Sequence, residues 1–308
     1  MDVLDKFEGL IEFWMKKMFL AVFLVFSMLV AFSQTDALRL KIHQIIRSKN
    51  ATVGVAISGI ETKDTLTIYG NQFFPLFSVV KFPTALTIFD LIDEKRLSLD
   101  STIHFIKSSL DTNTFSPLRD ESTKNEFDLS IRELLSYSVS RSDNIAFEKL
   151  VELAGRITVI NDYLQSLKFG GITIKSTASD GYNAYLKNQA SPLAMNELLI
   201  KTYTEKFLSI ESRDLLWKMM LETPTGPNRI KGLLPEGTKV FHKTGTSGAD
   251  ENGLSLAFND VGIVTLPNGK HFAISVFITN SKESDEENTK IIAEISKAAW
   301  DYFVSQKN

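Results

Sequence analysis

A long section with helical periodicity divides the strand-forming segments of this chain into two groups. Residues 81–221 carry apolar side chains at i, i+3 and i+4 spacing over most of their length, which predicts a series of amphipathic helices. On either side, short segments rich in β-branched residues alternate between apolar and polar positions, which predicts strands. Strands from both ends of the chain must therefore pair in one sheet, with the helical section inserted between them. The expected strands are residues 51–58, 65–69, 238–242, 261–266 and 271–279.

The predicted fold class is α+β. The chain is expected to form two lobes, of which one (the α/β lobe) combines a sheet with helices and the other is helical. The sheet lobe covers residues 38–75 and 225–305 and holds a five-stranded sheet flanked by terminal helices. We expect the strands to be antiparallel, because Pro267-Asn268-Gly269 joins two of them as a tight hairpin turn. The inserted lobe, residues 80–221, is expected to be all-helical. The cleft between the two lobes is the natural place for a site.

Composition excludes several classes of function. The chain has 308 residues, 44% of them hydrophobic, with a net charge of −3, which suits a sizeable core and argues against nucleic-acid binding. The absence of cysteine excludes disulfides, a thiol nucleophile and thiolate metal ligands. The four histidines lack the spacing of a metal site, so we expect neither a metal nor a cofactor.

The N-terminal residues resemble an export signal. Lys16 and Lys17 precede an apolar run over residues 18–32 that ends in small side chains, which predicts a signal peptide over residues 1–33. A transmembrane anchor is the alternative, but the run is shorter than the ~20 residues that span a membrane. Since acidic residues precede the basic pair, translation is expected to begin at Met15 or Met18. The mature protein is expected to be periplasmic or secreted, with no membrane contact.

Ser78 stands three residues before Lys81, where an apolar helical run begins. Positions i and i+3 share a helix face, so the amine can reach the hydroxyl. A serine nucleophile needs such an adjacent base, because the hydroxyl is a weak nucleophile at its ordinary pKa. Taken alone, this spacing more often reflects a capping serine followed by a surface lysine.

Two later motifs strengthen the catalytic interpretation. Ser142-Asp143-Asn144 follows a helical run, and Lys243-Thr244-Gly245 ends a predicted strand. By itself the first motif is also a helix cap, and the second is also a strand end entering a loop. Ser78 and Lys81 lie at the start of a predicted helix, Ser142-Asp143-Asn144 in a loop of the helical lobe, and Lys243-Thr244-Gly245 on the sheet. These three motifs can therefore meet only in the cleft between the lobes.

Together and in this order, the three motifs resemble those of the class A serine β-lactamases, a signature shared with penicillin-binding proteins. The resemblance extends over residues 38–305 and is greatest to the branch from Bacteroides and its relatives, which includes extended-spectrum enzymes. It implies a β-lactamase/transpeptidase-like fold, with residues 34–308 as the catalytic domain. It also implies a monomeric secreted serine hydrolase that opens the β-lactam ring, confers antibiotic resistance and needs no cofactor.

The resemblance also assigns catalytic roles. Ser78 is the nucleophile, Lys81 receives or shuttles its proton, and Ser142 relays a proton to the leaving nitrogen. If Lys243 crowds Lys81 and the site is partly desolvated, we expect a lowered pKa for Lys81, which suits it to act as a base. The backbone N–H groups of Ser78 and Thr246 form the oxyanion hole.

The remaining implied residues bind substrate. Asn144 holds the acylamide side chain, Thr244 and Lys243 hold the carboxylate, and Thr246 and Ser247 add hydrogen bonds. Arg229 resembles a position that directs a guanidinium at the same carboxylate, although a surface arginine is the alternative.

Two further residues carry open alternatives. Phe115 is either an aromatic at the mouth of the cleft or an ordinary loop residue. His242 is expected to pack within its strand rather than to catalyse.

The sequence departs from the family in the loop that normally supplies the deacylation base, a glutamate. We call residues 174–192 the Ω loop; no glutamate lies between Glu152 and Glu197. Ala178 or Ser179 takes the expected position. Asp180, the one carboxylate in the loop, is either a substitute base or a turn residue, since Asp-Gly is a common turn dipeptide.

Three activities therefore remain open at this stage. The first is a β-lactamase that hydrolyses its acyl-enzyme through Asp180 or a less well-placed water. The second is a penicillin-binding protein that stays acylated, and the third is a D,D-peptidase. The first two share Ser78 as the nucleophile and differ only in turnover.

Overall fold

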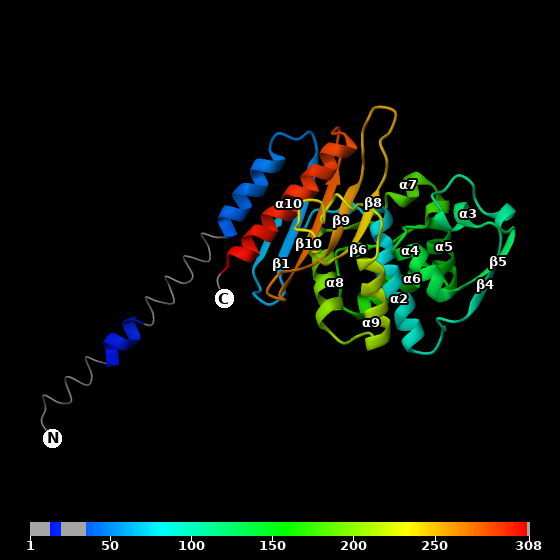
Figure 1. Ribbon diagram of the computed structural model, residues 1–308, viewed down its shortest axis with the longest axis horizontal. Coiled ribbons are helices and arrows are strands. Elements are labelled where there is room, and N and C mark those ends of the chain that lie inside the picture. The colour runs from blue at the N-terminus through cyan, green and yellow to red at the C-terminus, as the bar shows by residue number, and fades with distance from the viewer. Residues whose placement is uncertain (1–12, 20–34, 307–308) are drawn as a thin grey trace, which may run out of the picture.

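The computed structural model describes residues 13–19 and 35–306, and strands from both ends of the chain form its central sheet (Figure 1). The sheet has five strands in the order β2-β1-β10-β9-β8, and each neighbouring pair is antiparallel. This arrangement confirms the predicted α+β class and the pairing of both chain ends in one sheet. The strands are β1 (Thr52–Gly59), β2 (Thr65–Ile68), β8 (Val240–Thr246), β9 (Phe258–Thr265) and β10 (His271–Thr279).

Both faces of the sheet are buried, each against a different layer. Along β10, Ile274 and Val276 belong to the core beneath α10 (Asp285–Ser305) and the helix over residues 35–46. Figure 1 shows these two terminal helices side by side on one face. The alternate β10 residues Ala273 and Phe277 belong to the core of the helical lobe, because successive strand side chains point to opposite faces.

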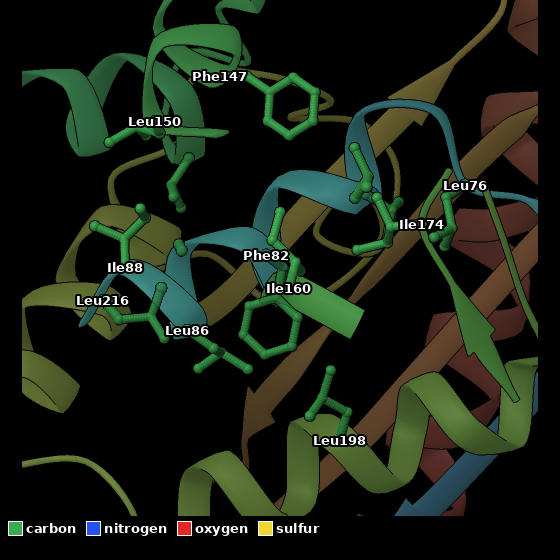
Figure 2. Close-up of a cluster of buried hydrophobic side chains, with 14 of the residues drawn as sticks. Leu76, Phe82, Leu86, Ile88, Phe147, Leu150, Ile160, Ile174, Leu198 and Leu216 are labelled. Atoms are coloured by element: carbon green, nitrogen blue, oxygen red, sulfur yellow. The ribbon is translucent and has the colours of Figure 1, made fainter. Parts of the chain in front are cut away.

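The helical lobe is built around α2 (Lys81–Asp93), which has ten of its 13 side chains buried. In Figure 2, Phe82, Leu86 and Ile88 of this helix lie among apolar side chains from the helices around it. Ser78 lies in the turn that leads into this buried helix, so packing of the lobe holds the serine in place. The surrounding helices are α3 (Pro117–Glu121), α4 (Ile131–Val139), α5 (Asn144–Leu153), α6 (Ile157–Ser166), α7 (Tyr182–Tyr185), α8 (Pro192–Thr204) and α9 (Ile210–Leu221).

The expectation of an all-helical lobe was wrong in one respect, since the lobe also contains short strands. β4 (Thr102–Ile106) pairs with β5 (Glu126–Ser130) at its outer edge, where Phe105 stacks on Phe127. Most side chains of both strands are exposed or half-buried, so the apolar alternation that marks a strand is weak there. The other short elements are β3 (Phe74–Pro75), β6 (Ile172–Thr173), β7 (Gln189–Ala190) and the 3₁₀ turns η1 (Phe77–Val80), η2 (Lys107–Ser109) and η3 (Ala178–Asp180).

Most of the expected signal peptide, including its cleavage site, lies outside the described residues. Within residues 13–19 and 35–306, none of the helices combines the length and apolar character needed to cross a membrane.

Candidate active site

Ser78 lies on η1, the tight turn that leads into α2. The preceding residue, Phe77, has a φ of 46°, a conformation that is uncommon for a bulky side chain. Its ring packs against Tyr182 and Tyr185, with ring centroids 5.6 and 5.5 Å away. Such backbone strain persists only where the surroundings enforce it, and it is often found at functional sites.

The amine of Lys81 contacts the Ser78 hydroxyl, as the i, i+3 spacing predicted. Lys81 Nζ donates to Ser78 Oγ at 2.9 Å, to the Ser142 carbonyl at 2.8 Å and to Asn144 Oδ1 at 2.6 Å. All three N–H donors of an ammonium are thereby used. The side chain is fully buried, and burial lowers the pKa of Lys81 to about 7, although the negative charges of Asp143 and Glu148 oppose the shift. A substantial share of the amines is therefore neutral near pH 7 and able to accept a proton.

A second buried lysine lies on the other side of the site. Lys243 Nζ donates to Ser142 Oγ at 2.9 Å and to the Thr244 carbonyl at 3.0 Å. Burial, reinforced by the charge of Lys81, lowers the pKa of Lys243 well below its ordinary value. Ser142 therefore connects the two amines, its carbonyl to Lys81 and its hydroxyl to Lys243.

Asp143 caps a helix, and its neighbour Asn144 contacts Lys81. The buried Asp143 carboxylate caps α5 by accepting from the Ala146 N–H at 2.8 Å, and it also accepts from Ser116 Oγ at 2.8 Å. Asn144, the first residue of α5, accepts from Lys81 and donates from Nδ2 to Thr114 Oγ1 at 2.8 Å. The helix cap thus fixes the side chains on either side of it.

Strand β8 approaches the turn of Ser78 closely because Gly245 has no side chain. A Cβ at this glycine would lie 2.4 Å from the Leu76 carbonyl oxygen and 3.1 Å from the Val79 nitrogen. Strand and turn can therefore meet only with glycine at this position.

Arg229 is buried at the site rather than exposed on the surface. Its Nη2 donates to Thr246 Oγ1 at 2.7 Å and its Nη1 to the Asn259 carbonyl at 2.8 Å. The guanidinium also lies 3.7 Å from the centre of the Phe258 ring, and burial lowers the pKa of Arg229. The surface alternative for this arginine is therefore wrong, since the guanidinium is buried beside the cleft.

These groups surround a cleft of about 590 Å³. Lys81 and Lys243 lie beneath its surface, and Phe115, 59% exposed, lines it at the edge. His242 is buried against Asp260, with Nδ1 3.0 Å from both carboxylate oxygens, and does not line the cleft. The predicted residues that do line it are Ser78, Ser142, Asn144, Thr244, Thr246, Ser247 and Arg229.

Asp180 is not among the residues that line the cleft. Its Oδ2 accepts from the Thr177 N–H at 2.8 Å and the Thr177 hydroxyl at 3.3 Å, which closes the turn η3. The structure thus places Asp180 as the turn alternative describes. Among the residues that the structure describes, no cluster of histidine and carboxylate side chains is arranged to hold a metal ion.

A family model, two related sequences and a related structure that match this chain are all those of β-lactamases. Residues 37–303 match a family model described as "Beta-lactamase enzyme family". The chain is 44% identical to β-lactamase VEB-1 of Pseudomonas aeruginosa, over 92% of this chain and 96% of that protein. It is 39% identical to a β-lactamase of Bacteroides uniformis, over 93% and 99% of the two chains. The crystal structure of the TLA-1 extended-spectrum β-lactamase has a TM-score of 0.85 at 43% identity, covering 88% of this chain and 99% of that one.

The chain belongs to the class A serine β-lactamases.

Two residues of this class A β-lactamase lie near the reacting groups without having been predicted. Glu148, one turn after Asn144 on α5, accepts from the Ser179 N–H at 2.7 Å and thereby holds the Ω loop. Burial raises the pKa of Glu148. Its i+4 spacing from Asn144 is a signal in the sequence, but a search for the missing base confined to the Ω loop misses it.

Tyr185, the last residue of α7, is the second residue near the site that the sequence analysis did not predict. It lines the cleft together with Ser78, yet no part of its position follows from a motif in the sequence. Packing of the Ω loop against η1 brings this phenol to Ser78.

Proposed function

We propose that this protein hydrolyses β-lactams through an acyl-enzyme on Ser78. The observation that carries the proposal is the contact between Ser78 Oγ and Lys81 Nζ, 2.9 Å apart, with the pKa of Lys81 lowered by burial to about 7. A neutral amine at hydrogen-bond distance is the base that a serine nucleophile requires.

Acylation follows from the arrangement around Ser78. The hydroxyl proton passes to Lys81 while Oγ bonds to the carbonyl carbon of the lactam. The C–N bond of the ring then breaks, and the nitrogen takes its proton from Ser142, which Lys243 resupplies across a 2.9 Å contact. We assign the oxyanion hole to the backbone N–H groups of Ser78 and Thr246, because β8 and η1 approach so closely at Gly245.

The cationic side of the cleft accounts for recognition of the lactam carboxylate. Lys243 and Arg229 are both buried, and Arg229 reaches the cleft through its bond to Thr246. The buried Arg229 guanidinium, and Lys243 when it is protonated, attract an anion more strongly than exposed cations do. We propose that Thr244, Thr246 and Ser247 add hydrogen bonds to the same carboxylate and that Asn144 holds the acylamide.

A second candidate, a protein that acylates and stays acylated, is favoured by one observation. The residues that line the cleft include no aspartate or glutamate, so no carboxylate is placed there to activate the hydrolytic water. The two candidates share every step up to the acyl-enzyme and differ in its lifetime.

Timed reaction with a chromogenic cephalosporin, combined with intact-protein mass measurement, separates them. We expect continuous turnover with a transient adduct, and neither adduct nor turnover in Ser78→Ala. One equivalent of product with a lasting adduct on Ser78 would establish the acyl-trapping protein instead. Absence of any adduct in the unsubstituted protein would contradict both.

We also propose that the protein is exported to the periplasm as a monomer. The support for export is the basic pair followed by an apolar run in the sequence, and the monomeric state is carried over from the family resemblance. N-terminal sequencing of the mature protein should place cleavage near Ser33, and light scattering should give the mass of a single chain. An uncleaved N-terminus would favour the anchor alternative.

A further inference from the structure

The phenol of Tyr185 is a buried polar group that the protein engages only weakly. The residue is 5% exposed, and within the described residues its hydroxyl makes no hydrogen bond of ordinary length; the hydrogen-bonding neighbour that acts on its pKa is the Ser78 side chain. Buried hydroxyls almost always have a partner, because leaving one unsatisfied costs free energy. An unpaired hydroxyl at the wall of a reaction cleft therefore indicates a small polar partner that enters through that cleft.

The position of this hydroxyl identifies the partner. Tyr185 lines the same cleft as Ser78, and the two hydroxyls lie close enough that the Ser78 side chain lowers the pKa of Tyr185, against the larger effect of burial. Its ring is held edge-on to Phe77, with centroids 5.5 Å apart, and to Phe147, 6.5 Å apart. The phenol is thus fixed beside the nucleophile and cannot turn toward another partner.

The hydrolysis of an ester on Ser78 needs a water molecule held against the acyl carbon. Lys81 already uses its donors on Ser78, Ser142 and Asn144, and Asp180 is engaged by its own turn. The Tyr185 hydroxyl is a buried group beside Ser78 that, among the described residues, has hydrogen-bonding capacity left for a water.

Resting on the function proposed above, we propose that Tyr185 is a catalytic residue of deacylation, holding the hydrolytic water that the missing Ω-loop glutamate would otherwise position. The Tyr185 oxygen accepts a hydrogen bond from the water, whose oxygen then bonds to the acyl carbon. The bond between that carbon and Ser78 Oγ breaks. Lys81 first releases to solvent the proton that it took from Ser78 during acylation. The other proton of the water then passes to the neutral Lys81 and from there to Ser78 Oγ, and Lys243 regains a proton from solvent, which restores the free enzyme.

Tyr185→Phe tests the assignment, because it removes only the hydroxyl and keeps the ring contacts. Acylation is expected to stay within about twofold while deacylation slows at least about tenfold, as expected for loss of a group that positions a reacting molecule. In steady state, kcat and KM should then fall by the same factor, leaving kcat/KM unchanged. Mass measurement should show the acyl adduct accumulating on Ser78.

Tyr163→Phe is the matched control. Tyr163 also has a buried hydroxyl without a hydrogen-bond partner, but it lies on α6 and does not line the cleft. Its removal is expected to change neither acylation nor deacylation. A purely structural effect of losing an unpaired phenol would appear in both variants as a change in melting temperature alone.

The outcomes separate this assignment from the proposed function. If the unsubstituted protein turns over through Ser78 and Tyr185→Phe deacylates at the same rate, Tyr185 has no role while the proposed function stands. Equal losses of acylation and deacylation would also overturn the assignment. An adduct that persists for hours in the unsubstituted protein would overturn the assignment together with hydrolysis, but not acylation.

Discussion

The contact between β8 and the turn of Ser78 predicts a large effect of one added methyl group. In Gly245→Ala, the new Cβ would lie 2.4 Å from the Leu76 carbonyl oxygen, in the backbone two residues before Ser78. Carbon–oxygen contacts in proteins are about 3.3 Å or longer, so strand and turn must separate by about 0.9 Å. Backbone atoms on both sides leave no flexible side chain to absorb the displacement.

The separation moves one proposed oxyanion donor, on Thr246, away from the other, on Ser78. A misplacement of about 1 Å costs on the order of 100-fold in rate, so we expect the acylation rate of Gly245→Ala to fall by about that factor. Overpacking should also lower the free energy of unfolding by about 1–3 kcal/mol. Stopped-flow acylation with a chromogenic cephalosporin and urea unfolding measure the two effects.

Gly170→Ala is the control, because a Cβ at Gly170 meets no atom within 4 Å. This variant should acylate normally and unfold at the same urea concentration or a slightly higher one. Acylation of Gly245→Ala within about threefold of the unsubstituted rate would refute the reasoning, since strand and turn would then not need their close approach.

Three further predictions concern the titrating groups. Because Lys81 must be neutral and its pKa is about 7, kcat/KM for acylation should fall about tenfold per pH unit below pH 7 in a pH–rate profile; a flat profile down to pH 5 would exclude Lys81 as the base. Glu148→Gln removes a negative charge that raises the pKa of Lys81. The acid limb of the pH–rate profile should therefore move to lower pH by at most about one unit. Loss of deacylation at every pH would instead make Glu148 itself the base. Asp180→Asn keeps an oxygen that can accept from Thr177 and should change steady-state turnover by less than about threefold; a loss of about 100-fold would restore Asp180 as the deacylation base.

The sequence predicted those parts of the fold and site that depend on local spacing or on strong periodicity. The i, i+3 relation of Ser78 to Lys81 appears as a 2.9 Å contact, and the sheet pairs both chain ends as expected. The hairpin of β4 and β5 was missed, because its mostly exposed strands lack an apolar alternation.

The deacylation side of the site was the least predictable. Asp180 was a candidate because it is the loop's one carboxylate, but local hydrogen bonds to Thr177 engage it in a turn. Glu148 reaches the Ω loop from α5, 31 positions earlier in the chain than Ser179, which it contacts. Tyr185 reaches Ser78 from more than a hundred positions away. Such contacts arise from packing of separate elements, and no short motif records them.

By itself, the sequence predicted the strands of the central sheet, most of the helices, the family and the placement of Ser78 beside Lys81. These features depend on residues a few positions apart or on a repeating apolar pattern, which the chain displays directly. Only the tertiary structure decided the charge state of Lys81, the direction of Arg229 and the unpaired hydroxyl of Tyr185. Each of these follows from burial, and burial is set by elements far apart in the chain that remove a polar group from water together.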